Sequence, residues 1–273
     1  TGDFTANMDE IDIDIAPGTS GNVARWDNDN DGTQVDWRIP NPSFAVNPEN
    51  DNIWGWEWPA NTEVEIMVDG NPYYRTTNGN GDFGDQFPYD IQVGHFIQVS
   101  GGGIVKDHTV LALTFTGYEE LDDTVSGITT TGATVNVWGC DYDNCAWIDV
   151  TADETTGDFT ANMDEIDIDI APGTSGNVAR WDTENDGTVI DWRVPNPSFR
   201  VNPENDNVWG WEWPADTEIT LTINGNPYST TVFTNENGEF NFDQLGIDIQ
   251  VGDELQVSGG GIVKDHTVLA LTF

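Results

Sequence analysis

Residues 52–83 decide the fold, and they read Asn-Ile-Trp-Gly at 52–55, Val-Glu-Ile-Met-Val at 64–68 and Asn-Gly-Asn-Gly-Asp-Phe at 78–83. Apolar and polar side chains alternate in the middle segment, which is the period of a strand with one buried face. The last segment is rich in Asn and Gly, which are typical of tight turns. Strand-like runs separated by turns at intervals of about 8–12 residues predict an antiparallel β-sandwich.

Self-similarity is the strongest signal along the rest of the chain. Residues 1–46 return at 156–201 with six substitutions, at positions 28, 29, 34, 35, 39 and 45. Residues 91–115 return at 249–273 with three, at positions 95, 96 and 97. One period holds two related units, which we name type A and type B.

These repeats predict an all-β chain of tandem antiparallel, immunoglobulin-like β-sandwiches of two alternating unit types. Type A is expected at 43–115 and 197–273, and type B at 116–196, while residues 1–42 match the C-terminal half of type B. Half a sandwich cannot cover its apolar face or pair its open edge. Either the chain is a fragment of a longer array, or strands from a neighbouring chain complete the half-unit, as in donor-strand assembly.

Short motifs in both unit types resemble a known class of domain. The Val-Ser-Gly start at 125–127, the Gly-Asp-Phe turn at 157–159 and the Pro-Gly pair at 172–173 are similar to bacterial immunoglobulin-like and transthyretin-like (carboxypeptidase-regulatory-like) repeats. The resemblance covers nearly the whole chain. It implies a fold and a location in secreted or surface proteins, and no catalytic activity.

The charge of the chain limits its partners. The formal net charge is −41, from 49 Asp and Glu against 8 Lys and Arg. Such a surface repels phosphate backbones and anionic lipid, which argues against nucleic acid and membrane partners, and it attracts cations. Twelve Trp and 37% hydrophobic residues exclude an acidic disordered tail. We expect an extracellular or cell-surface location.

The two cysteines, Cys140 and Cys145, stand four residues apart between strand-like runs. A disulfide that closes a hairpin loop fits this spacing and an oxidising compartment. A two-cysteine metal site is the alternative, but no further Cys or nearby His completes it.

Two acidic loops are candidate calcium sites. Carboxylates at alternate positions before a Gly turn, as at 27–32 and again at 182–187, let a short loop wrap a hard cation with oxygen ligands. The start of the loop resembles an EF-hand, but Arg38 and Arg193 stand where that loop places its bidentate Glu. The alternative is a solvated hairpin tip. The candidate Ca²⁺ ligands are Asp27, Asp29, Asp31 and Asp36, and in the second copy Asp182, Glu184, Asp186 and Asp191.

Tryptophan alternates in each type A unit, at Trp54, Trp56 and Trp58, and again at Trp209, Trp211 and Trp213. If Ile53 faces the core, all three indoles of a unit share the outer face of the strand. Such a stripe is too apolar to be left in water, so it is expected to cover a neighbouring domain, a neighbouring chain or a sugar ring. A flipped register, with these indoles in the core, is the alternative.

Catalytic motifs are not recognisable, and the Lys-Asp-His triplets at 106–108 and 264–266 are more typical of structural histidines than of an active site. We therefore expect a non-enzymatic structural repeat protein, a filament, stalk or surface-layer subunit. Its partners would be copies of itself or the continuing array. A carbohydrate-binding adhesin that uses the tryptophan stripes on a polysaccharide is the alternative function.

Overall fold

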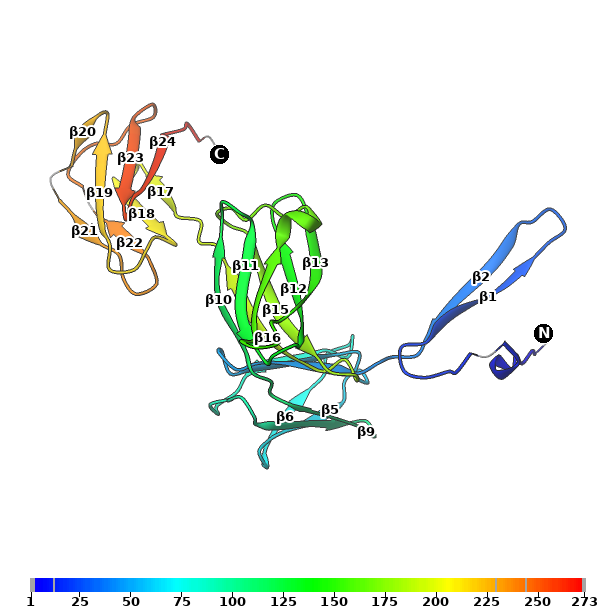
Figure 1. Cartoon of the computed structure of the whole chain (residues 1–273). Coiled ribbons are helices and arrows are strands. Elements are labelled where there is room, and N and C mark those ends of the chain that lie inside the picture. The colour runs from blue at the N-terminus through cyan, green and yellow to red at the C-terminus, as the bar shows by residue number, and fades with distance from the viewer. Residues whose placement is uncertain (1–2, 12, 229, 244, 272–273) are drawn as a thin grey trace. The chain divides into compact units, whose positions relative to one another are not determined.

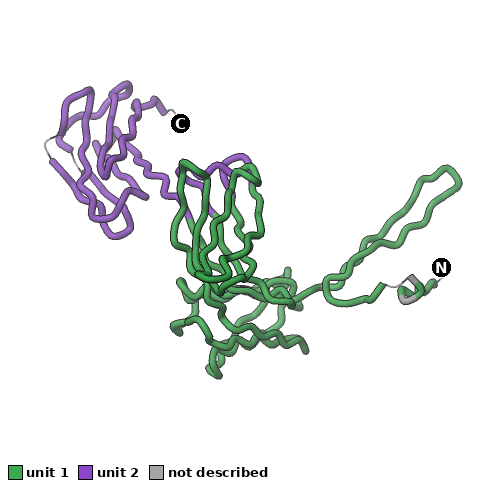
Figure 2. The backbone as a smooth tube through the Cα atoms, viewed as in Figure 1, with its two compact units in different colours: residues 1–139, 145–167, 176–192 green, residues 140–144, 168–175, 193–273 purple. Residues whose placement is uncertain are grey.

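The computed structural model describes residues 3–11, 13–228, 230–243 and 245–271, and it is all-β with mostly antiparallel sheets, as predicted (Figure 1). The chain forms two compact units: unit 1 holds residues 1–139, 145–167 and 176–192, and unit 2 holds 140–144, 168–175 and 193–273 (Figure 2). The predicted boundaries at residues 42, 115 and 196 stay predictions. Within the described ranges, no helix is long and apolar enough to cross a membrane.

In unit 1, residues 43–112 form two sheets around one core, and we call this segment module A1. The strand order is β3-β4-β7 in one sheet and β6-β5-β8-β9 in the other. Ile53, Val64 and Ile66 lie in the buried cluster between them, so the alternation read from the sequence sets the inward face. The strands are β3 (Ser43–Asn47), β4 (Asn52–Trp56), β5 (Glu63–Val68), β6 (Asn71–Thr76), β7 (Phe83–Gln86), β8 (Phe96–Gly101) and β9 (Ile104–Thr109).

Residues 113–193 supply most of the next sandwich, which we call module B. Strands β10, β11 and β14 form one sheet, and β13, β12, β15 and β16 lie in the other. Both cysteines, at the facing ends of β12 and β13, are disulfide-bonded, which confirms the predicted hairpin bridge. The elements are β10 (Leu113–Glu119), β11 (Thr124–Thr129), β12 (Thr134–Cys140), β13 (Cys145–Thr151), β14 (Asp158–Asn162), the 3-10 helix η2 (Met163–Ile166), β15 (Ser175–Trp181) and β16 (Gly187–Arg193).

The two modules share a sheet, which the sequence did not indicate. Strand β16 pairs in parallel with β3, with Gly187 opposite Ala45 and Thr188 opposite Val46. The resulting order is β13-β12-β15-β16-β3-β4-β7, a single seven-stranded sheet. Module B therefore covers the open edge of module A1 with its last strand.

The N-terminal segment holds the counterpart of β15 and β16. It consists of a 3-10 helix, η1 (Met8–Ile11), and a hairpin of β1 (Ser20–Trp26) and β2 (Gly32–Arg38). The hairpin pairs Val23 with Val35, and both side chains are exposed. In module B the same positions, Val178 and Ile190, are buried.

Unit 2 contains the second type A segment, residues 197–273, which we call module A2. Its sheets follow the orders β17-β18-β22 and β20-β19-β23-β24, with β21 paired to β19. Ile219, Leu221 and Val257 lie in its buried core. The strands are β17 (Ser198–Asn202), β18 (Asn207–Trp211), β19 (Glu218–Ile223), β20 (Asn226–Pro227), β21 (Val232–Phe233), β22 (Phe240–Phe242), β23 (Glu254–Gly259) and β24 (Ile262–Thr267).

Candidate functional site

The loop between β15 and β16, residues 182–187, takes its shape from its own side chains. Asp182 Oδ1 accepts the backbone N–H groups of Glu184 at 2.9 Å and Asp186 at 3.0 Å. Asn185 adopts a left-handed backbone with φ of 67°, which Asn tolerates better than most residues. Because these contacts are local, the sequence of the loop suffices to form the turn.

Asp186 places a carboxylate inside the junction between modules A1 and B. The residue is fully buried, and its Oδ1 accepts the N–H of Phe44 at 2.8 Å. Lys106 Nζ lies 3.5 Å from Oδ2 and supplies the countercharge. Burial raises the pKa of Asp186 to about 6, although Phe44 and Lys106 both favour the ionised form. Asp186 therefore joins module B to two residues of module A1, Phe44 and Lys106.

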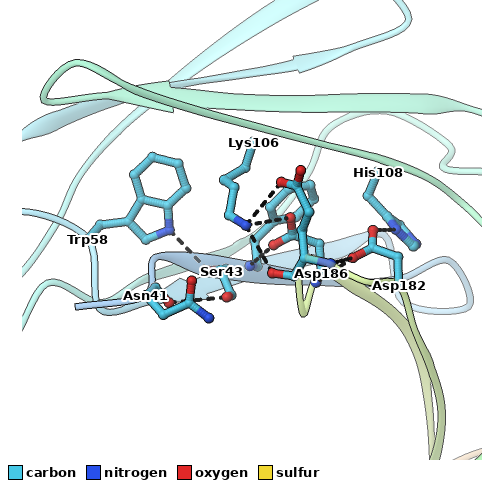
Figure 3. Close-up of polar contacts among 9 residues, drawn as sticks. Asn41, Ser43, Trp58, Lys106, His108, Asp182 and Asp186 are labelled. Carbon is cyan, nitrogen blue, oxygen red and sulfur yellow. Dashed lines mark hydrogen bonds and ion pairs between the residues drawn. The ribbon is translucent and has the colours of Figure 1, made fainter. Parts of the chain in front are cut away.

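His108 joins the same junction from strand β9 (Figure 3). Its Nδ1 lies 2.9 Å from Asp182 Oδ2, and its Nε2 lies 2.9 Å from Thr188 Oγ1. The N–H of Leu111 also donates to Thr188 Oγ1, at 2.9 Å. A carboxylate can only accept hydrogen bonds, so Nδ1 of His108 is the donor to Asp182. One histidine thus bridges the loop and the docked strand.

Two tryptophans supply the apolar part of the junction. Trp54 and Trp56 are half-buried and pack against a small cluster that both modules build. Trp56 also meets Trp181 edge to face, with ring centroids 6.1 Å apart, a geometry that aromatic pairs prefer. In unit 1 these indoles therefore cover a neighbouring domain, one of the outcomes predicted for an outward stripe. The cluster consists of Ala45, Ala179 and Val189.

The third indole corrects the predicted stripe. Trp58 is 3% exposed and belongs to the core of module A1. Strand β4 ends at Trp56, and Glu57 has a φ of 61°, so the alternation of an extended strand stops there and Trp58 turns inward. Its Nε1 donates to the carbonyl of Ser43 at 3.0 Å. Trp213 does the same in module A2, where it is also 3% exposed.

Three of the four predicted calcium ligands of the first copy lie at an exposed hairpin tip. Asp27 Oδ1 accepts the N–H groups of Asp29 at 2.9 Å and Asp31 at 3.0 Å, as in the second copy. Asp36 lies along strand β2, where it accepts from Gln34 Nε2 at 2.8 Å. The structure thus keeps Asp27, Asp29 and Asp31 in one turn.

In the second copy the predicted ligands make protein contacts. Asp182 and Asp186 hold His108 and Lys106, as described, and Glu184 pairs with Lys106 Nζ at 3.2 Å. Asp191 accepts from Asn47 Nδ2 at 3.0 Å. Within the described part of the chain, no three Asp, Glu, His or Cys side chains are grouped so that they could hold a metal ion. Calcium binding at either loop stays a prediction.

The junction joins modules A1 and B through a strand pair, hydrogen bonds, an ion pair and apolar packing. Sequence reasoning placed carboxylates at the loop but missed their partners, which lie between 74 and 144 residues away in the chain. The available signal was the joint repetition of two patterns, Asp-x-x-x-Asp-Gly-Thr at 182–188 and Lys-Asp-His at 106–108. Repetition alone does not say that they meet.

Comparison with known proteins adds little beyond the fold. No family model matches the chain, and no curated protein matches it significantly. Among solved structures, it is similar to a tetra-tandem repeat from the extending region of a large adhesion protein, with a TM-score of 0.23 and 10% identity over 92% of this chain and 81% of that one.

A Ca²⁺-stabilized adhesin of an Antarctic bacterium gives a TM-score of 0.20 and 15% identity over 91% of this chain and 80% of the other. A two-domain fibronectin type III segment of chicken tenascin gives 0.20 and 12% identity, over 52% and 91% respectively. At such low scores these likenesses carry no conclusion about the partner, the metal or the activity of this chain.

Proposed function

We propose that this chain is an extracellular structural repeat protein, a filament, stalk or surface-layer subunit whose β-sandwich modules are locked in pairs. The observation that carries the proposal is the shared sheet of unit 1, in which β16 of module B pairs with β3 of module A1. Its role is mechanical, because a junction of this kind resists bending between modules.

The contacts of the junction explain its stiffness. A hinge between modules A1 and B would expose Ala45, Ala179 and Val189, which are buried together. It would also leave the N–H of Phe44 without the carboxylate of Asp186. Lost apolar burial and lost hydrogen bonds both cost free energy, so the two modules are expected to move and unfold as one body.

The disulfide and the charge support an extracellular setting. Disulfides persist mainly in oxidising compartments, and both cysteines are bonded. A net charge of −41 keeps a long assembly soluble and draws cations to its loops. We include calcium stiffening at the 27–31 loop in the proposal. We also include completion of the 20–38 hairpin by strands of a neighbouring copy, because Val23 and Val35 are uncovered.

Calorimetry of the whole chain tests the locked pair. The wild type should unfold modules A1 and B in one transition. A double variant, Lys106→Ala with His108→Ala, should split that transition into two. The matched control is Lys264→Ala with His266→Ala, which changes the same residue types in module A2 and should leave the transition of unit 1 unchanged. Two separate transitions in the wild type would refute the proposal.

Carbohydrate binding is the second candidate, and one observation favours it. Trp209 and Trp211 of module A2 are half-buried, as Trp54 and Trp56 are, and a groove beside Trp209 is lined by Val201, Pro203 and Leu269. Retention of the chain on polysaccharide affinity gels, lost in Trp209→Ala, would support this function. Trp58 and Trp213 are buried, so they offer no platform for a sugar ring.

A further inference from the structure

We propose that module A2 binds the 20–38 hairpin of a second copy of this chain, through contacts that repeat the internal junction of unit 1. This inference rests on the proposed function, because it takes module junctions to be what builds the assembly. It names the occupant of the uncovered face of module A2 and the residues on both sides of the contact.

Most of the polar residues in both halves of the junction recur elsewhere in the chain. Module A2 carries the same four receiving residues as module A1, and the hairpin carries the same four docking residues as module B. The receiving residues are Phe199, Lys264, His266 and Leu269, in place of Phe44, Lys106, His108 and Leu111. The docking residues are Asp27, Asp31, Gly32 and Thr33, in place of Asp182, Asp186, Gly187 and Thr188.

Two local contacts of the occupied junction recur on the unoccupied surfaces. Phe199 meets His266 edge to face at 6.1 Å and 87°, and Phe44 meets His108 at 6.3 Å and 86°. On the hairpin, Asp27 caps the N–H of Asp31 with the same bond that shapes the docked loop. Binding would therefore require little rearrangement, which lowers its entropic cost.

The side chains of these surfaces are more exposed than their counterparts in the internal junction. His108 is 4% exposed, whereas His266 is exposed. Asp186 is fully buried, whereas Asp31 at the same position of the hairpin is exposed. On the module side, Leu269 is 64% exposed. Uncovered apolar groups beside uncovered ionic ones are typical of an interface.

Two of the six substitutions between the repeats fall on one contact. In the internal junction, Ala45 packs with Val189. Their counterparts are Arg200 in module A2 and Gln34 in the hairpin, so an apolar pair has become a polar one on both sides at once. Arg against Val189 would bury an unpaired charge, whereas Arg against Gln34 can form hydrogen bonds. This change matches module A2 to the 20–38 hairpin and not to the 175–193 hairpin.

Charge favours the same occupant. Arg200 stacks its guanidinium over the ring of Trp211, 5.1 Å from the centroid, and thereby adds a positive charge to a face that already carries Lys264 and His266. The hairpin tip presents Asp27, Asp29 and Asp31. Local charge complementarity of this kind can overcome the repulsion between two chains of net charge −41. Salt helps, because it screens the long-range repulsion more than the short-range contacts.

The contact joins two different surfaces, the hairpin of one copy and module A2 of the next. A dimer formed by such a heterologous contact still has one free surface of each kind, so further copies can add. The result is an open chain, or a ring if the rotation between successive copies closes. The structure therefore points to head-to-tail growth of the assembly.

Sedimentation velocity of the whole chain over a range of concentrations, at moderate salt, tests the proposal. The wild type should form concentration-dependent oligomers. Asp31→Ala and His266→Ala should each weaken the association more than about tenfold. Because both residues are exposed at the surface, the variants should keep the melting temperature of the wild type.

Mixing the two variants gives the decisive result. Asp31→Ala retains a normal module A2, and His266→Ala retains a normal hairpin, so a one-to-one mixture should form heterodimers and no longer chains. A wild type that stays monomeric, oligomers that both variants form equally well, or retention on polysaccharide gels without self-association would overturn the proposal. The single calorimetric transition of unit 1 would survive any of these outcomes, which separates this inference from the proposed function.

Discussion

Modules A1 and A2 differ in their surroundings more than in the residues that form the receiving face. In module A1, residues 43–47 of the first strand are all buried, and His108 is buried with them. In module A2, strand β17 at 198–202 is half-buried or exposed, and His266 is exposed. The difference comes from module B, which covers one face with a parallel strand and an acidic loop. Burial of this face therefore depends on a neighbour, whereas the core of each module does not.

The largest expected effect falls on a residue that both modules use in the same way. Trp58→Ala and Trp213→Ala each remove an indole that is 3% exposed and hydrogen-bonded to a backbone carbonyl. Each should lower the free energy of unfolding of its own unit by about 3–5 kcal/mol. Denaturant melts followed separately for each unit would show this. A much smaller loss in one unit would mean that the cores are not equivalent.

Lys106→Met should separate the two modules. It removes the countercharge of buried Asp186 and should destabilise unit 1 by about 3 kcal/mol, because a buried carboxylate is left unpaired. The matched change, Lys264→Met in module A2, should leave the stability of a monomeric chain nearly unchanged. Chemical denaturation at neutral pH measures both. Equal losses in the two variants would contradict the role given to the junction.

Unit 1 should also respond to pH through Asp186. Because burial raises its pKa from 3.8 to about 6, the folded state holds a proton between pH 4 and 6 that the unfolded state releases. Stability from this group is therefore fully present below pH 4 and is lost as the pH rises through 6, by on the order of 3 kcal/mol at most.

The groups around Asp186 are Lys106, Asp182, Glu184 and His108, so a variant is needed to isolate its titration. Asp186→Asn should flatten the pH dependence of unfolding of unit 1 between pH 4 and 6, measured against the wild type in the same buffers. Asp31→Asn, at the exposed counterpart, is the control and should leave that dependence intact. Identical pH profiles for wild type and Asp186→Asn would refute the assignment.

Trp56→Ala tests the apolar part of the junction with a smaller effect. It removes an edge-to-face contact with Trp181 and the cover of the Ala45 cluster, beyond the area that the indole buries within its own module. Trp56→Ala should lower the free energy of unfolding of unit 1 by about 1 kcal/mol more than Trp211→Ala lowers that of unit 2. Thermal melts of the two variants give this difference. A larger loss of stability in Trp211→Ala would contradict the claim that Trp56, and not Trp211, contacts a neighbouring module.

Chelation of divalent cations should give the smallest effect and sharpen the comparison of the loops. If calcium binds the open 27–31 loop, chelator should lower the melting temperature by a few degrees, roughly 4 °C. Asp27→Ala should remove this response. Asp182 and Asp186 already contact His108 and Lys106, so their loop should contribute little. Identical melts with and without chelator would remove the metal from the proposed function.

Particular residues show how far the sequence could be read. Ile53, Val64 and Ile66 alternate with polar residues, and the structure buries all three, because a strand with one wet face requires that period. The cysteines in one hairpin loop indicated their bond for a similar local reason. The prediction that Trp58 faces outward was wrong because Trp58 turns inward at Glu57, which has a positive φ. Positive φ is uncommon for Glu, so the sequence does not indicate this turn.

Local chemistry and repetition, both readable in the sequence, determined the strands, the turns and the acidic hairpin tips, because those features depend on neighbours a few residues away. Only the tertiary structure decided that one acidic tip is buried against Lys106 and His108 while its near-copy stays open. Docking depends on surfaces distant in the chain that meet after each module has folded. Two nearly identical loops therefore acquire opposite environments, and their own residues do not reveal which loop is buried and which is exposed.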